Sequence, residues 1–209
     1  MKKILIVLFC LSVSAGSYLE TFAETLNPPE DSVKTHHSNK DIHKKNYDVI
    51  ITFDNSKLAP QNVRIIFNEL FGQYIKVKDA LVYNDSYNAV RNMLQLLDDM
   101  KAKTKYIDIL NKDDRWVLFI MNYDMIRKKI ESATLIRDRR FLFNEITNGL
   151  QTFIKQYGLN DKTIYLMQNE SSLESGNGIW FSTSDDKKNP YRGLTNDTTY
   201  AKVLEVWKF

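Results

Sequence analysis

Apolar residues recur three and four positions apart through the middle of the chain, which is the spacing of one face of an α-helix. Ile66, Leu70 and Tyr74 begin the first such stripe, and further stripes follow it. Pro60 suits the first position of a helix, and Gly158 suits the end of one. The spacing predicts four amphipathic helices, near residues 60–83, 86–103, 113–134 and 137–157. Four helices with short connections predict an antiparallel four-helix bundle.

Beyond Gly158 the helical spacing stops, and short β-prone runs replace it. We expect this C-terminal tail, residues 159–209, to be partly extended and to pack on the bundle. Trp180 and Tyr191 are its best anchors, because each buries a large ring and keeps a polar group for a hydrogen bond. Residues 47–53 are also β-prone and predict an extended lead-in. The predicted fold class is therefore mainly α: an antiparallel four-helix bundle with a partly extended C-terminal tail packed on it.

The N-terminus has the order of a secretory signal peptide. Two lysines precede an apolar run over residues 4–13, and small and polar residues follow it. The run is too short to span a bilayer as a helix. We predict a signal peptide over residues 1–23, with cleavage after Ala15 or Ala23 and export to the periplasm. An uncleaved N-terminal anchor is the alternative.

Composition narrows the classes of partner. The chain of 209 residues is long enough for one domain with a small extension. A net charge of +3, with basic residues spread among acidic ones, argues against a nucleic-acid partner. We expect no transmembrane segment after signal removal. Cys10 is the single cysteine and lies inside the apolar run, so the mature chain is expected to have no disulfide and no thiolate chemistry.

A polar segment over residues 24–45 predicts a flexible linker ahead of a folded domain over residues 46–209. The linker holds all three histidines of the chain, His36, His37 and His43. Imidazoles are ligands for zinc and copper, so these residues are candidates for adventitious or dedicated metal binding.

Four short motifs occur in order along the domain. They are Tyr-Ile-Lys-Val-Lys-Asp-Ala-Leu-Val at 74–82, Ile-Arg-Asp-Arg-Arg at 136–140 followed by Phe143, Gly-Ile-Trp-Phe-Ser at 178–182, and Asn-Pro-Tyr-Arg-Gly at 189–193. In sequence and spacing they resemble the bacterial envelope family known as domain of unknown function 3347. The resemblance covers most of the mature chain. It implies a helical domain that occurs in small secreted proteins and as an extension of heavy-metal efflux periplasmic adaptors.

The resemblance also implies a metal site that this chain has lost. Family tails carry cysteine and methionine before the tryptophan and after the Asn-Pro-Tyr turn, and such soft sulfur ligands suit copper(I). Here those positions fall near Asn169, Ser171, Asn196 and Thr199, none of which carries sulfur. Met167 is the nearest sulfur, and a lone thioether is a weak ligand. We therefore expect no cofactor, with a copper- or zinc-binding periplasmic protein as the alternative.

Two interpretations of the turn at residues 189–193 are open. The turn fixes the tail to the bundle, or it presents Tyr191 and Arg192 to a partner or a small acidic ligand. In the second case Trp180 and Arg140 are further candidates, and Arg140 would join Arg192 in an anion-binding patch with the neighbouring arginines Arg137 and Arg139. An ordinary solvated helix face with local ion pairs is the competing explanation for those arginines.

Enzymatic chemistry finds little support in the sequence. The mature chain has no cysteine nucleophile, no histidine outside the linker and no glycine-rich phosphate loop. Adjacent carboxylates at 98–99, 113–114 and 185–186 leave a small hydrolase as a second alternative. The expected function is that of a non-enzymatic periplasmic domain of the cell envelope that binds or interacts with other molecules. We expect it to be a degenerate relative of metal-efflux-associated domains and to have an envelope protein as its partner.

Overall fold

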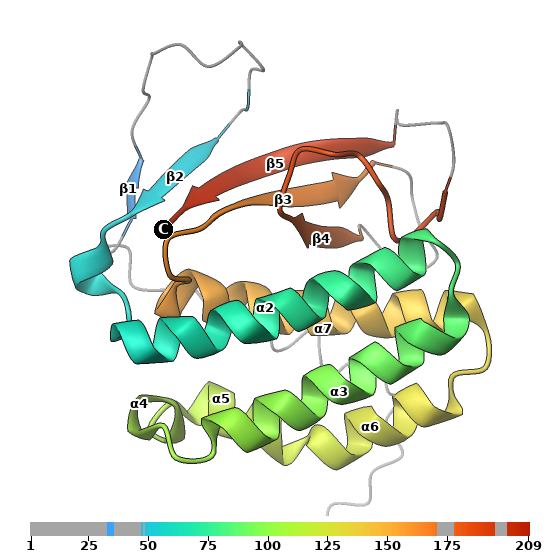
Figure 1. Cartoon of the computed structure of the whole chain (residues 1–209), viewed down its shortest axis with the longest axis horizontal. Helices are drawn as coiled ribbons and strands as arrows, with labels where there is room; N and C mark the ends of the chain where they lie inside the picture. Colours follow the sequence, from blue (N-terminus) through green and yellow to red (C-terminus); the bar gives the residue numbers. More distant parts are fainter. Residues whose placement is uncertain (1–32, 36–46, 48, 171–177, 195–199) are drawn as a thin grey trace, which may run out of the picture.

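The computed structural model describes residues 33–35, 47, 49–170, 178–194 and 200–209. This part of the chain is mainly helical, as predicted, and a mixed β-sheet covers one side of the helices (Figure 1). The predicted signal peptide and the three histidines lie outside the described residues. Along the chain the elements are β1 (Val33–Thr35), β2 (Ile50–Phe53), the 3-10 helix η2 (Asn55–Lys57), α2 (Gln61–Val82), α3 (Ser86–Thr104), α4 (Asp108–Asn111), α5 (Asp114–Met121), α6 (Tyr123–Ser132), α7 (Ile136–Tyr157), β3 (Thr163–Asn169), β4 (Ile179–Ser182) and β5 (Ala201–Lys208).

The helices begin and end at residues that the sequence marks. Pro60 directly precedes α2 rather than occupying its first position. Asp85 accepts a hydrogen bond from the backbone N–H of Asn88 at 3.0 Å and caps the start of α3. α7 ends at Gly158, whose φ of +81° is a conformation that favours glycine. Among the described helices, none is long and apolar enough to cross a lipid bilayer.

The single helix predicted over residues 113–134 is wrong in one respect, because two helices, α5 and α6, occupy that range. They separate at Asn122, whose side-chain amide donates to the carbonyl oxygen of Leu118 at 3.0 Å. The backbone N–H of Asn122 donates to the same oxygen, so side chain and backbone share one acceptor. Asparagine interrupts helices by such local bonds. The apolar period runs on past this break, which is why the pattern predicts one element.

The extended segments form a sheet, so a four-helix bundle with a tail is not an adequate description of the fold. The strand order is β1-β2-β5-β3-β4. β5 pairs parallel with β2, and every other pairing is antiparallel. β2 and β4, for example, are short apolar runs whose partners lie elsewhere in the sequence. Local periodicity identifies such runs but does not predict their pairing.

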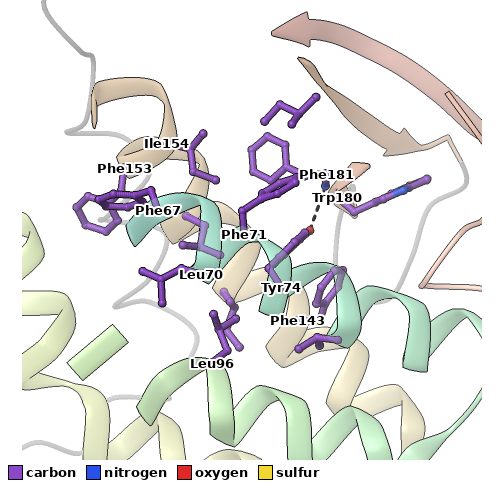
Figure 2. Packing of buried hydrophobic residues seen from close by; sticks show 14 of the residues in the cluster. Phe67, Leu70, Phe71, Tyr74, Leu96, Phe143, Phe153, Ile154, Trp180 and Phe181 are labelled. Atoms are coloured by element: carbon purple, nitrogen blue, oxygen red, sulfur yellow. Dashed lines mark hydrogen bonds between the residues drawn. The ribbon is translucent and has the colours of Figure 1, made fainter. Parts of the chain in front are cut away.

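The molecule has three layers, with the sheet on top, α2 and α7 in the middle, and α3 to α6 below (Figure 1). Aromatic rings fill the space between sheet and middle layer (Figure 2). Tyr74 of α2 stacks on Phe143 of α7 with centroids 5.1 Å apart. Phe181 of β4 contacts Tyr74 at 6.0 Å and Trp207 of β5 at 5.3 Å. These contacts make the tail part of the central core.

Candidate functional site

The tail meets the helices at one end of the molecule, where the α2–α3 turn and the first half of α7 lie beside the segment that precedes β5. We call this region the tail junction. It consists of Asn84, Arg140, Asn144, Asn169, Trp180, Asn189, Tyr191, Arg192 and Tyr200. All four candidates Trp180, Tyr191, Arg192 and Arg140 therefore lie in one region.

Arg140 connects α7 to the turn at residues 189–193. Its Nε donates to the carbonyl oxygen of Pro190 at 2.8 Å, and its Nη2 donates to Asn84 Oδ1 at 2.7 Å. Burial lowers the pKa of this guanidinium. Arg140 therefore bonds neutral groups of the protein. Of its neighbours, Arg139 donates to Ser86 and Arg137 is exposed beside Asp138.

The turn itself is held by Asn189 and Gly193. Asn189 Oδ1 accepts from the backbone N–H of Tyr191 at 2.9 Å, and the Asn189 amide donates to Asn169 Oδ1 at 2.7 Å. Gly193 has φ +77°, and a Cβ on it would lie 2.7 Å from the side chain of Asn84. The glycine permits the close approach of the turn to the helices. These contacts support the interpretation that the turn fixes the tail.

Tyr191 is buried beside Trp180, with ring centroids 6.0 Å apart at 62°. Its hydroxyl donates to the carbonyl oxygen of Ile179 at 2.6 Å and lies 3.1 Å from Asn144 Oδ1. Burial raises the pKa of Tyr191 well above its ordinary value, so the phenol stays protonated. Trp180 is fully buried. Both rings serve the core, and neither is available to a ligand in solution.

Side chains of the helices satisfy the outer edge of β4. The backbone N–H of Ile179 donates to Asn144 Oδ1 at 3.3 Å. The N–H of Phe181 donates to the hydroxyl of Tyr74 at 3.0 Å (Figure 2). An edge strand otherwise presents free backbone groups on which another chain can pair. Sequence reasoning assigned Tyr74 to the core and did not single out Asn144, because nothing local to an asparagine indicates a distant strand.

Arg192 differs from the other residues of the tail junction. Its guanidinium carbon lies 3.8 Å from the ring centroid of Tyr200, a cation–π contact. Its Nε is buried and has no hydrogen-bond partner among the described residues. Arg192 is only partly buried, in contrast to Tyr191 before it. Arg192 is therefore a partly buried cation whose recorded side-chain contact is an aromatic ring.

Comparison with known families finds a match for the helical part of the chain. Residues 70–162 match the model of a family described as a protein of unknown function, DUF3347. This part of the chain is similar to the DUF3347 family. The match begins within α2, ends just before β3 and confirms the resemblance seen in the helical motifs. No curated protein and no solved structure matches the chain.

Of the four positions at which the resemblance implies sulfur ligands, the structure describes one. Asn169 is fully buried and accepts from Asn189, while positions 171, 196 and 199 lie outside the described residues. Met167 is also fully buried and pairs with Trp180 across β3 and β4. Within the described ranges, no three His, Cys, Asp or Glu side chains are placed to hold a metal ion.

Two of the three adjacent carboxylate pairs are engaged in structural contacts. Asp98 accepts from Arg127 at 2.7 Å and from the hydroxyl of Tyr123. Asp185 accepts from Tyr47 at 3.0 Å, and Asp186 pairs with Lys188 at 3.0 Å. The bonds of Asp98 and Asp185 attach separate segments to one another, whereas Asp186 pairs with a residue of its own loop.

The third pair adjoins an open hollow of about 470 Å³ at the start of α5 and the end of α7. Arg115 donates to both oxygens of Asp113, at 2.9 and 2.8 Å, and the hydroxyl of Tyr157 donates to Oδ2. Burial alone would raise the pKa of Asp113, but these hydrogen bonds outweigh it and lower the pKa to about 2. Asp113 is therefore a carboxylate at neutral pH and is unsuited to act as a general acid.

The pKa of Asp113 predicts how stability depends on pH. A folded-state pKa below the ordinary 3.8 stabilises the protein above pH 3.8, and this contribution is lost as the pH falls from 3.8 to about 2. We expect Asp113→Asn, which keeps an N-cap residue, to reduce the pH-dependent loss by about 1 kcal/mol, since solvent screens part of the interaction. Urea unfolding above and within this window measures it. An equal effect of Asp114→Asn, at the exposed neighbour, would contradict the assignment.

Proposed function

We propose that this protein is an exported, non-enzymatic binding module of the cell envelope that holds a protein partner at the tail-junction end. The carrying observation is a group of exposed apolar side chains around the tail junction. They are Tyr83, Tyr87, Leu135 and Leu194, and each is at least 55% exposed. We call this group the junction patch. Isolated exposed apolar residues are ordinary on a protein surface, whereas a group of them at one end is typical of an interaction site.

Hydrogen bonds bring the four segments of the junction patch together. Tyr83 and Tyr87 flank the α2–α3 turn, in which Asn84 accepts from Arg140. Leu135 directly precedes α7, whose Arg139 donates to Ser86. Leu194 follows Gly193, which packs against Asn84. A partner that covers the junction patch would therefore contact α2, α3, α7 and the tail at once. Tyrosine suits such a surface, because a rigid ring buries area at little entropic cost and keeps a hydroxyl for hydrogen bonding.

The engagement of the polar groups supports binding over catalysis. Asn84, Asn144, Asn169 and Asn189 bond to the protein's own groups, and Tyr191 stays protonated in the core. The positions at which the resemblance implies sulfur ligands carry no sulfur in this chain, which supports a relative of metal-handling domains that no longer binds metal. Export follows from the N-terminal sequence pattern.

Photo-crosslinking tests the proposed surface. A photoreactive phenylalanine analogue replaces Tyr83 or Tyr87 in the full chain, expressed in cells, and Tyr106 serves as the matched control. Tyr106 is 82% exposed and lies just after α3, at the end of that helix remote from Tyr87. We expect a discrete crosslinked product from the two junction positions and none from Tyr106. The double variant Tyr83→Ala with Tyr87→Ala is expected to reduce partner recovery at least tenfold, about 1.4 kcal/mol.

Equal crosslinking from all three positions, or none from any, would contradict the proposed surface.

Titration of the mature domain with copper(I) and zinc tests the alternative that the protein binds metal. Tight, stoichiometric binding that survives deletion of residues 24–45 would overturn the proposal, because the linker histidines would then not be its source. Binding that disappears with the linker would assign the metal to His36, His37 and His43 and leave the junction patch intact.

A further inference from the structure

Arg192 is a cation that the fold positions and that no described residue pairs. The other arginines of the tail-junction end show the contrast, since Arg140 donates to Pro190 and Asn84. The guanidinium of Arg192 forms no ion pair and no hydrogen bond with any residue that the structure describes. Its attachment is the ring of Tyr200, at 3.8 Å.

The protein holds Arg192 from both sides. Its backbone N–H donates to the carbonyl oxygen of Asn189 at 3.3 Å, and it stands between buried Tyr191 and the positive-φ Gly193. The carbonyl oxygen of Tyr200 accepts from the N–H of Glu170 at the end of β3, at 2.8 Å. Backbone bonds therefore position both the cation and the ring. An arginine arranged in this way loses less side-chain entropy on binding than a free one.

The orientation of the guanidinium limits what it can bind. The guanidinium carbon lies over the ring of Tyr200 and Nε is buried, so the two terminal nitrogens supply the donors that remain for a ligand. A planar pair of N–H donors matches the two oxygens of a carboxylate. This chain contains a completed example elsewhere, where Arg115 bonds both oxygens of Asp113 at 2.9 and 2.8 Å. Arg192 has the donors for such a pair, but no carboxylate of the described residues is bound to them.

We propose that Arg192, supported by Tyr200, is a carboxylate-binding site. Its ligand is a carboxylate of the partner chain, either an acidic side chain or a C-terminal carboxylate, bound by the two terminal nitrogens of Arg192. The inference rests on the proposed function, because the site lies in the same tail junction that the junction patch surrounds. It adds the chemical class of group that the partner presents.

Two peptide probes test the site on the mature protein. The first is acetyl-Gly-Phe-Leu with a free C-terminal carboxylate, compared with its amide. The second is acetyl-Glu-Glu-Glu-amide, compared with its glutamine counterpart. Binding is followed by the NMR signal of the Arg192 Nε–H group. We expect a saturable shift with at least one carboxylate probe and none with the matched neutral peptide, and the responding probe identifies the source of the carboxylate.

Three variants distinguish a built site from general charge attraction. Arg192→Gln is expected to weaken binding at least tenfold. Arg192→Lys should weaken it severalfold, because a point charge cannot form the paired bonds. Arg64→Gln is the matched control, since Arg64 also has a buried Nε without a partner and lies near the start of α2. Thermal unfolding of each variant checks that the fold is retained.

The proposal is overturned if no probe shifts the Arg192 signal, if Arg64→Gln and Arg192→Gln weaken binding equally, or if Arg192→Lys binds as well as the wild type. Its failure is separable from that of the proposed function. Crosslinking at Tyr83 and Tyr87 that persists in the Arg192→Gln variant, without peptide binding, would leave the partner surface standing and remove the carboxylate site alone.

Discussion

Replacing Trp180 with alanine is expected to lower the free energy of unfolding by about 3–5 kcal/mol. The indole is fully buried, pairs with Met167 across the sheet and contacts the ring of Tyr191. Its removal would leave a cavity between β4 and the turn at residues 189–193 that the remaining side chains cannot fill. Urea unfolding followed by far-ultraviolet circular dichroism measures the change without relying on tryptophan fluorescence.

Trp180→Phe provides the control for this prediction. The indole N–H of Trp180 donates to no described residue, so phenylalanine removes volume without leaving an acceptor unpaired. We expect a cost of about 1 kcal/mol, for the lost volume alone. A phenylalanine variant as unstable as the alanine variant would show that the indole N–H has an essential partner. A nearly neutral alanine variant would show that the tail does not depend on Trp180.

Replacing Tyr74 with phenylalanine is expected to cost about 1–3 kcal/mol, although it removes a single oxygen atom. That oxygen accepts from the N–H of Phe181 at 3.0 Å and lies 3.0 Å from Thr147 Oγ1, which donates to the carbonyl oxygen of Phe143 at 2.8 Å. The hydroxyl of Tyr74 therefore both accepts and donates. Without it, the buried N–H of Phe181 has no acceptor and the outer edge of β4 loses one of its two attachments.

Hydrogen exchange localises the effect of Tyr74→Phe. The amide of Phe181 should exchange faster in the variant by more than the change in global stability accounts for, because the loss is local to β4. Tyr87→Phe, at a residue that is 75% exposed, should change neither stability nor exchange. Unchanged exchange at Phe181 would mean that another group accepts its hydrogen bond.

The helices could be predicted because their information is local. Each helix buries a stripe at fixed spacing, and that spacing placed α2, α3 and α7 within one or two residues of their observed bounds. The break at Asn122 was missed because it changes hydrogen bonding without changing the apolar period. The sheet was missed for a different reason. β2 pairs with β5 across about 150 residues, and no local pattern specifies such a pairing.

The tail junction, like the fold, could be predicted from the sequence only in part. Large or charged residues such as Trp180, Tyr191, Arg192 and Arg140 drew attention through their size, their charge and their place in motifs. The asparagines that connect them did not, since an asparagine in a sequence is read as a cap or a turn residue. Asn144 is an example, because its role depends on the N–H of Ile179, which the fold brings to it from 35 positions away.

The place of β5 in the sheet sets an order of events during synthesis. β2, residues 50–53, has β5 as its parallel neighbour, and β3 borders β5 on the other side. The residues of all the described helices have therefore been synthesised before residues 201–208 leave the ribosome. Until then β2 and β3 each have an edge that β5 will later pair, and the core lacks the buried side chain of Trp207. The nascent chain is thus expected to stay open, and available to chaperones, until β5 inserts and joins the two halves of the sheet.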